Sequence, residues 1–363
     1  MNYTHGYYSV GDKTFVNKIE ALTHASKIYQ PVIWDFNSDV YGAIDWTKKP
    51  SGTLRELYRD RAQQIRDKYD YVILNFSGGM DSWTMLHSFF SNNIHVDEVY
   101  TRWSLAQRKY KDPDPFDTSE YNKTSEFEYA VMPTLKYIET NFPKTKITIH
   151  DYSDKLQTAL HDDDFLLVNK FQNMSTFFKY NYKSNSELLQ ESHGKKIGII
   201  AGWEKINYEW RDDNFYAYFV DVSDQVAPPE RNVELFYWSI DFPSIPILQA
   251  HCLKEYIITN PSADYLRIKT PDKWRLMRHL YHCVCYPDYD ISTFQVEKPA
   301  GSLIWNSESW TYNYNPKFVQ SWVWGIKQIY NGINDKFVRH HDTNNLITGL
   351  HPFRSPAPNG YLV

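Results

Sequence analysis

Residues 77–82 contain the side chains in this chain that are best suited to chemistry, in the order Ser-Gly-Gly-Met-Asp-Ser. Two adjacent glycines let a backbone approach an anion closely and turn its amide groups toward it. A helix that begins directly after them would add the partial positive charge of its N-terminus. We therefore expect this hexapeptide to bind phosphate groups. The simpler alternative is an ordinary glycine turn between a strand and a helix.

The apolar residues on either side of the hexapeptide predict the elements that position it. Residues 71–76 form a nearly continuous apolar run, which is typical of a strand buried on both faces, and residues 83–90 have the apolar spacing of a helix. The glycine spacing differs from the Walker loop G-x-x-x-x-G-K-[ST] and from the dinucleotide motif G-x-G-x-x-G. The sequence thus predicts a strand, a different kind of phosphate loop, and a helix in succession.

The hexapeptide resembles the PP-loop signature S-G-G-x-D-S of the ATP pyrophosphatase superfamily, which includes asparagine synthetase, GMP synthetase and NAD synthetase. In that superfamily the loop holds the β,γ-pyrophosphate of ATP, and a substrate oxygen attacks the α-phosphate. The resemblance implies that ATP and Mg²⁺ bind here, with Asp81 helping to place the metal ion and acting in catalysis. It assigns pyrophosphate binding to Ser77, Gly78, Gly79 and Ser82.

Further apolar runs at 95–101, 146–150 and 196–202 predict three more strands, separated by helical segments. Residues 71–205 therefore predict a doubly wound parallel α/β sheet, which the resemblance makes a Rossmann-like PP-loop core of the HUP type. Arg102 ends the second strand, where ligands of such sheets gather, so it would contact ATP or substrate unless it is a solvated loop charge. Lys205 follows the fourth strand and would neutralise the departing pyrophosphate, unless it is a surface lysine.

Three parts of the chain are predicted from these patterns. Residues 1–68 form an N-terminal α+β module with a hairpin at 6–16 and helices at 18–29 and 54–69, residues 69–230 form the nucleotide-binding domain, and residues 231–363 form a mainly helical extension. The run 235–257 in this extension is similar to the carboxyl region of phage-encoded asparagine synthase-like proteins. The likeness also covers residues 286–288 and 294–299.

An asparagine synthetase that hydrolyses glutamine carries a nucleophilic cysteine directly after the initiator methionine. In this sequence Asn2 stands at that position, and no cysteine precedes Cys252. Glutamine hydrolysis of that type needs an activated thiolate, which a carboxamide cannot replace. We therefore expect no built-in glutaminase, so that free ammonia or a separate amidotransferase would supply the nitrogen.

Composition predicts a cytoplasmic protein, or one of the host cytoplasm if a phage encodes it. The chain has 363 residues and a formal net charge of -5, and no stretch approaches the roughly 18 apolar residues of a membrane span. Its three cysteines, Cys252, Cys283 and Cys285, fit a reducing compartment better than a disulfide framework. The aromatic content of 17% suits an AT-rich genome such as that of a phage.

Two other clusters contain residue types that can bind a metal ion or a nucleic acid. His279, His282, Cys283 and Cys285 include zinc-ligand types, but their spacing lacks the paired arms of a tetrahedral site. Basic residues at 267–278 could dock tRNA or DNA, or form a solvated helix face. His251 is either a packing histidine or a base.

From the resemblance we expect an ATP-dependent adenylating enzyme that forms AMP and pyrophosphate while activating a carboxylate or amide oxygen for amide or amidine formation. Its acceptor would be a small molecule or a nucleobase, without a role for membranes. Three alternatives stay open: a sulfur-transferring or PAPS-reductase-like enzyme, a nucleobase-modifying enzyme, and a non-catalytic nucleotide-binding protein.

Overall fold

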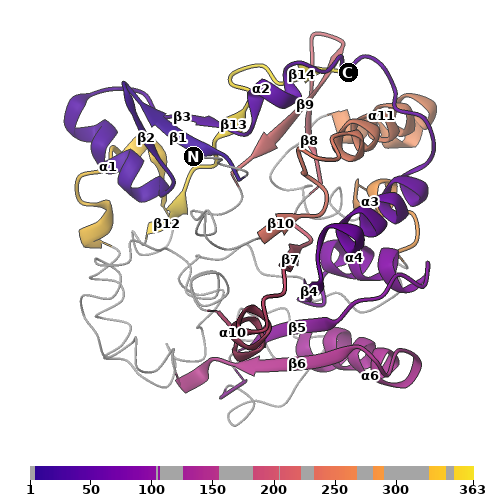
Figure 1. The fold of residues 1–363 in the computed structure, drawn as a ribbon. Coiled ribbons are helices and arrows are strands. Elements are labelled where there is room, and N and C mark those ends of the chain that lie inside the picture. The colour runs from indigo at the N-terminus through magenta and orange to yellow at the C-terminus, as the bar shows by residue number, and fades with distance from the viewer. Residues whose placement is uncertain are drawn as a thin grey trace.

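A sheet of five parallel strands forms the centre of the fold (Figure 1). In the order in which they pair, the strands are β10 (Val233–Leu235), β7 (Ile197–Ala201), β4 (Tyr71–Asn75), β5 (Glu98–Trp103) and β6 (Lys146–Asp151). The computed structural model describes residues 5–103, 105–106, 126–154, 183–203, 205–221, 233–267, 281–289, 327–340 and 347–363. The sheet confirms the predicted parallel α/β class and is compatible with a doubly wound arrangement.

The helices that accompany this sheet are α3 (Leu54–Lys68), α4 (Met80–Phe90), α6 (Met132–Asn141), which continues the π-helical turn η2 (Phe127–Val131), and α10 (Asn185–Ser192). In Figure 1, α3 and α4 lie side by side on one side of the strands, with α10 on the other. Helix α3 begins at a capping box between Thr53 and Glu56. Helix α4 begins at Met80 rather than at Trp83, because Gly79 is its N-cap. The hexapeptide therefore includes the first turn of this helix.

The order of the strands reverses between β4 and β7. The chain passes from β4 outward to β5 and β6, then returns to the other side of β4 to form β7 and β10. All five residues of β4 and of β7 are buried, as expected for strands covered on both faces. In open α/β sheets, ligands bind outside the carboxyl ends of the strands at such a reversal. The segments after β4 and β7 leave the sheet at this place.

The N-terminal residues form a small antiparallel sheet in the order β2-β1-β3, made of β1 (Tyr7–Val10), β2 (Lys13–Phe15) and β3 (Ile33–Asp35). Helix α1 (Lys18–Ile28) follows the hairpin and is capped by Asn17, whose side chain accepts from Glu20 N–H. The hairpin and the helix lie where the sequence predicts them. A short helix, α2 (Ser38–Tyr41), follows β3.

A second antiparallel sheet forms around β9 (Asn214–Val220), which pairs with β8 (Asn207–Arg211), β13 (Arg354–Ser355) and β14 (Tyr361–Leu362). The last residues of the chain thus pair with a strand that precedes the boundary predicted at 230/231. Strand β10, which follows that boundary, belongs to the central sheet. The described remainder contains α11 (Ser244–Thr259), η3 (Pro261–Arg267), η5 (Asp335–Phe337), β11 (Val338–His340) and β12 (Ile347–Leu350).

A buried ion pair joins the N-terminal module to the sheet around β9. Lys18 Nζ lies 2.7 Å from Asp221 Oδ2, with both side chains almost fully buried. The same carboxylate accepts from Tyr8 OH at 2.9 Å and from the backbone N–H of Phe353. Charges that are removed from water need partners of this kind. Residues from the two ends of the chain therefore meet at one carboxylate.

Some features discussed from the sequence lie outside the described residues: Asn2, His279, and the basic residues from 268 onward. In the part of the chain that the structure does describe, no helix is long and apolar enough to cross a membrane.

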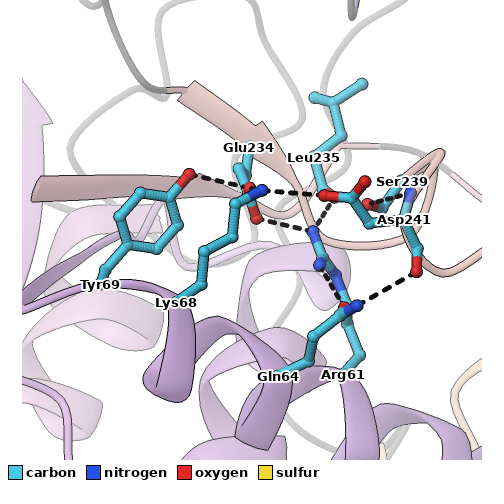
Figure 2. A network of polar contacts seen from close by, with 8 residues as sticks. All are labelled: Arg61, Gln64, Lys68, Tyr69, Glu234, Leu235, Ser239 and Asp241. Atoms are coloured by element: carbon cyan, nitrogen blue, oxygen red, sulfur yellow. Dashed lines mark hydrogen bonds and ion pairs between the residues drawn. The ribbon is translucent and has the colours of Figure 1, made fainter. Parts of the chain in front are cut away.

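A polar network attaches β10, the edge strand of the sheet, to helix α3 (Figure 2). The Glu234 carboxylate accepts from Arg61 Nη2 at 2.9 Å, from Tyr69 OH at 2.8 Å and from Lys68 Nζ. Arg61 is fully buried and also donates to the carbonyl of Leu235 at 3.1 Å. Burial by itself would raise the pKa of Glu234, but the charge of Arg61 and the bonds from Lys68 and Tyr69 outweigh it, so the pKa is lowered.

Replacing Glu234 by glutamine should lower the free energy of unfolding by about 3 kcal/mol at neutral pH, because Arg61 would stay buried without a counter-charge. The pKa of Glu234 is lower in the folded state, so its ionic contribution is present above the usual glutamate pKa of about 4.3 and disappears as the pH falls through the folded value. Urea titrations at several pH values would measure both effects.

The matched control is Glu255→Gln, which breaks an exposed pair with Lys49 and should cost below about 1 kcal/mol. Equal losses in the two variants, or a Glu234→Gln deficit that grows as the medium becomes acidic, would contradict this account of the network.

Candidate functional site

The loop between β4 and α4 is held in shape by its two serines. The backbone N–H of Ser77 donates to Ser82 Oγ at 3.2 Å, and the two hydroxyl oxygens lie 3.2 Å apart. Ser82 Oγ in turn donates to the carbonyl of Gly79 at 3.0 Å. The hydroxyls of the two predicted phosphate-binding serines therefore lie together where the loop enters the helix.

The two glycines of the loop have different structural reasons for being glycine. Gly78 has φ +81°, and a Cβ atom placed on it would lie 2.8 Å from Val131 Cγ2. Gly79 has φ -76°, and among the described residues a Cβ atom there would meet only Ser77 Oγ, at 3.7 Å. The backbone and its packing require glycine at position 78. At position 79 the missing side chain leaves space beside the N-terminus of α4, where an anion is favoured.

Asp81 and Lys205 approach each other from the two loops at the reversal of strand order. Lys205 Nζ lies 3.8 Å from Asp81 Oδ1, and the lysine side chain is only 5% exposed. A Cβ atom on Gly202 would lie 2.9 Å from the Asp81 carbonyl oxygen, so the segment after β7 passes directly against the first turn of α4. Lys205 is thus buried beside the loop between β4 and α4 and is not a solvated surface lysine.

Two tyrosines that the sequence did not single out as functional also contact Asp81. Tyr286 OH donates to the Asp81 carboxylate, and Tyr237 OH donates to its backbone carbonyl at 2.6 Å. Burial, and after it the charge of Asp81, raises the pKa of Tyr286 well above its ordinary value, so the hydroxyl keeps its proton. With 29 tyrosines in the chain, no local pattern marks these two, and their contacts with Asp81 span long sequence separations.

Arg102, predicted as an ATP or substrate contact, lies among residues of β5 and α10. Its guanidinium carbon is 4.3 Å from the centre of the Tyr100 ring, and its Nη2 lies 4.0 Å from Glu187 Oε2. The arginine side chain is 7% exposed, so it is not a solvated loop charge either. Its charge is directed toward the first turn of α10, and among the described residues it has no contact with Asp81, Lys205, Ser77 or Ser82.

The environments of His251 and of the three cysteines are those of packed interior residues and do not favour reactivity. His251 Nε2 lies 3.0 Å from the carbonyl of Trp46, and burial lowers its pKa. Burial also raises the pKa of Cys252, Cys283 and Cys285. Within the described ranges, no group of three or more His, Cys, Asp or Glu side chains is arranged to hold a metal ion.

No protein-family model, curated protein or solved structure matches this chain. Its function therefore has to be inferred from the chemistry of the loop and of the side chains around it.

Replacing Gly78 by alanine should destabilise the protein by more than the same change at Gly194. Both glycines have positive φ, and forcing alanine into that conformation costs about 1–2 kcal/mol. At Gly194 no described residue lies within 4 Å of the new methyl group, whereas Gly78 packs against Val131, and such overpacking adds about 1–3 kcal/mol. Chemical denaturation of both variants measures the difference, and equal losses would mean that Val131 yields to the methyl group.

Proposed function

We propose that this protein is an ATP-dependent adenylating enzyme that releases AMP and pyrophosphate. The observation that carries the proposal is the position of the Ser-Gly-Gly-Met-Asp-Ser loop. It connects a central buried strand to a helix N-terminus where the strand order reverses, and a buried lysine approaches it from the next loop. This arrangement supports a PP-loop domain of the Rossmann-like HUP type, in which the signature resembles that of ATP pyrophosphatases.

The loop offers two kinds of group for the pyrophosphate of ATP. The hydroxyls of Ser77 and Ser82 lie 3.2 Å apart, and the amides near Gly79 begin helix α4, whose N-terminus favours negative charge. Because Gly79 lacks a side chain, a phosphate can come close to this backbone. In our proposal these groups bind the β,γ-pyrophosphate.

The same site suits a magnesium ion that accompanies ATP. Mg²⁺ prefers oxygen ligands and is commonly bound through one or two carboxylates together with substrate phosphates and water. Asp81 supplies a carboxylate and Ser77 and Ser82 supply hydroxyls, so the donor set is made of oxygens. We assign the metal contact to Asp81. When bound, the ion would neutralise charge on the phosphates.

Lys205 provides positive charge at a place from which water is largely excluded. A fixed charge in such surroundings stabilises charge that develops during reaction more strongly than it would in water. In the proposed reaction an oxygen of the acceptor attacks the α-phosphorus, the bond to the β-phosphate oxygen breaks, and the electron pair leaves with pyrophosphate. Lys205 would stabilise this leaving group, and an amine would then displace AMP to form the amide.

Sulfur transfer is less well supported by the described residues. Such chemistry needs a reactive thiolate, which forms readily where positive charge or a helix N-terminus lowers the pKa of the cysteine. Burial raises the pKa of Cys252, Cys283 and Cys285, and these are the cysteines of the sequence. A nucleobase acceptor or a purely nucleotide-binding role is separated from amide formation by the experiments below.

The first experiment concerns the bond that is broken. The purified protein, incubated with ATP, Mg²⁺, ammonium and a panel of carboxylic acids and nucleobases, should form AMP and pyrophosphate in equal amounts. Chromatography of the nucleotides together with a pyrophosphate assay measures this. Lys205→Met should lower the rate by about 10²–10³-fold, the usual effect of removing one stabiliser of transition-state charge.

The control for that charge is Lys49→Met, which removes an exposed lysine paired with Glu255 and should leave the rate unchanged. Formation of ADP and phosphate alone would exclude the proposed reaction. Tight ATP binding without turnover across the whole panel would favour a non-catalytic nucleotide-binding protein.

The second experiment concerns the loop. Gly79→Val should fold, because φ at this position suits any residue and the nearest atom to the new Cβ in the part of the chain that the structure describes is 3.7 Å away. It should nevertheless weaken ATP binding at least about tenfold, or 1.4 kcal/mol, by filling the space that a phosphate would enter. Calorimetric titration with MgATP measures the affinity. Gly332→Val serves as the control, because it adds a side chain at a place where no described residue lies within 4 Å of the new Cβ. Full ATP affinity in folded Gly79→Val would show that the loop does not bind ATP.

A further inference from the structure

Asp81 and Lys205 belong to a ring of polar contacts that extends from the loop into the interior of the protein. On one side, Tyr286 OH donates to Asp81 Oδ1, while Lys205 Nζ lies 3.8 Å from the same oxygen. Tyr237 OH donates a hydrogen bond to the backbone carbonyl of Asp81 at 2.6 Å. The side chains of both tyrosines are buried, so water does not replace these contacts easily.

The ring closes through helices α3 and α11. Ile206, which follows Lys205, donates its backbone N–H to Gln249 Oε1 at 3.0 Å, and Gln249 Nε2 donates to Tyr58 OH at 2.8 Å. Tyr58 OH then donates to the carbonyl of Cys285 at 2.6 Å, and Cys285 precedes Tyr286 in the chain. Tyr58, Gln249 and Cys285 are fully or almost fully buried. The backbone beside Lys205 is thus connected to the backbone beside Tyr286.

We propose that Tyr286 is a positioning residue that orients the Asp81 carboxylate toward the magnesium ion of MgATP, and that Gln249 positions Lys205 through Ile206. This inference rests on the proposed function. It assigns part of the nucleotide site to α11 and to the segment 281–289, which the sequence treated as an extension outside the nucleotide-binding domain.

Physical reasons favour this role over simple packing. A hydrogen bond to a metal-binding carboxylate fixes its orientation, and removing such a partner typically weakens metal binding by about 10–100-fold. The hydrogen bonds run from Ile206 N–H to Gln249, from Gln249 to Tyr58, from Tyr58 to the carbonyl of Cys285, and from Tyr286 to Asp81. Because each donor points at a different acceptor, the contacts define a single arrangement of the side chains.

The test compares two tyrosine-to-phenylalanine variants of the full chain. Tyr286→Phe should raise the Mg²⁺ concentration needed for half-maximal ATP binding by about 10–100-fold, because the carboxylate loses the donor that orients it. ATP binding in the presence of a chelator should not change. The control is Tyr71→Phe, which removes a buried hydroxyl-to-carboxylate bond of 3.0 Å to Glu98 at the other end of β4 and should leave the Mg²⁺ requirement unchanged.

The outcomes separate this inference from the proposed function. If the wild-type protein fails to bind MgATP, the proposed function fails, and the roles of Tyr286 and Gln249 fail with it. If the wild type binds MgATP and Tyr286→Phe has the wild-type Mg²⁺ requirement, only the role of Tyr286 is overturned. A loss of thermal stability equal to that of Tyr71→Phe, without a shift in the Mg²⁺ requirement, would show that Tyr286 only packs.

Gln249→Met tests the other half of the ring and serves alone if Tyr286→Phe does not fold. It keeps the length of the side chain but removes both hydrogen bonds, so Lys205 loses the anchor at Ile206. ATP affinity at saturating Mg²⁺ should fall while the Mg²⁺ requirement stays at the wild-type value. Unchanged ATP affinity in folded Gln249→Met would overturn the positioning of Lys205.

Discussion

The pairing of β4 with β7 is the constraint on which the candidate site depends. These strands run parallel in register over five residue pairs, from Tyr71 opposite Ile197 to Asn75 opposite Ala201. Because parallel strands end at the same edge of a sheet, the loop after β4 and the segment after β7 start at the same level. Gly202 makes their close approach feasible, since any side chain there would meet the Asp81 carbonyl. The distance between Asp81 and Lys205 therefore follows from strand register rather than from either loop alone.

The buried polar contacts of the protein add little net free energy of folding, but each fixes the relative position of the segments that it joins. A buried ion pair or hydrogen bond gains little net energy over apolar packing, whereas removing one partner leaves a buried group unsatisfied. Glu234 with Arg61, Asp221 with Lys18 and Tyr286 with Asp81 each connect segments that are far apart in sequence. Apolar burial drives folding, and the polar pairs select the arrangement that presents the loop.

The sequence predicted those parts of the structure whose signals are local. The apolar runs of β4 and β7, the helix after the loop, and the helix predicted at 54–69 each depend on a short stretch of sequence, and all are present. Tyr286 and Gln249 could not be found in this way, because their contacts depend on how α11 and residues 281–289 pack against α3. Gln249 and His251 are polar but buried, because α11 is covered on several sides. The approach of Arg102 to Glu187 was unpredictable for the same reason, because Glu187 lies on a helix that follows a long intervening segment.

The separation of Asp81 and Lys205 bears on how the proposed site would work. At 3.8 Å the two charged groups attract each other, but the distance exceeds that of a direct hydrogen bond. The ammonium group can therefore turn toward a phosphate without first breaking a hydrogen bond to this carboxylate oxygen. The carboxylate keeps its orientation through Tyr286 when the lysine turns, and the backbone beside Lys205 is held by Gln249. Under the proposed function, a phosphate that draws the lysine toward it would therefore leave the Asp81 carboxylate, to which we assign the metal ion, oriented by its own hydrogen bond from Tyr286.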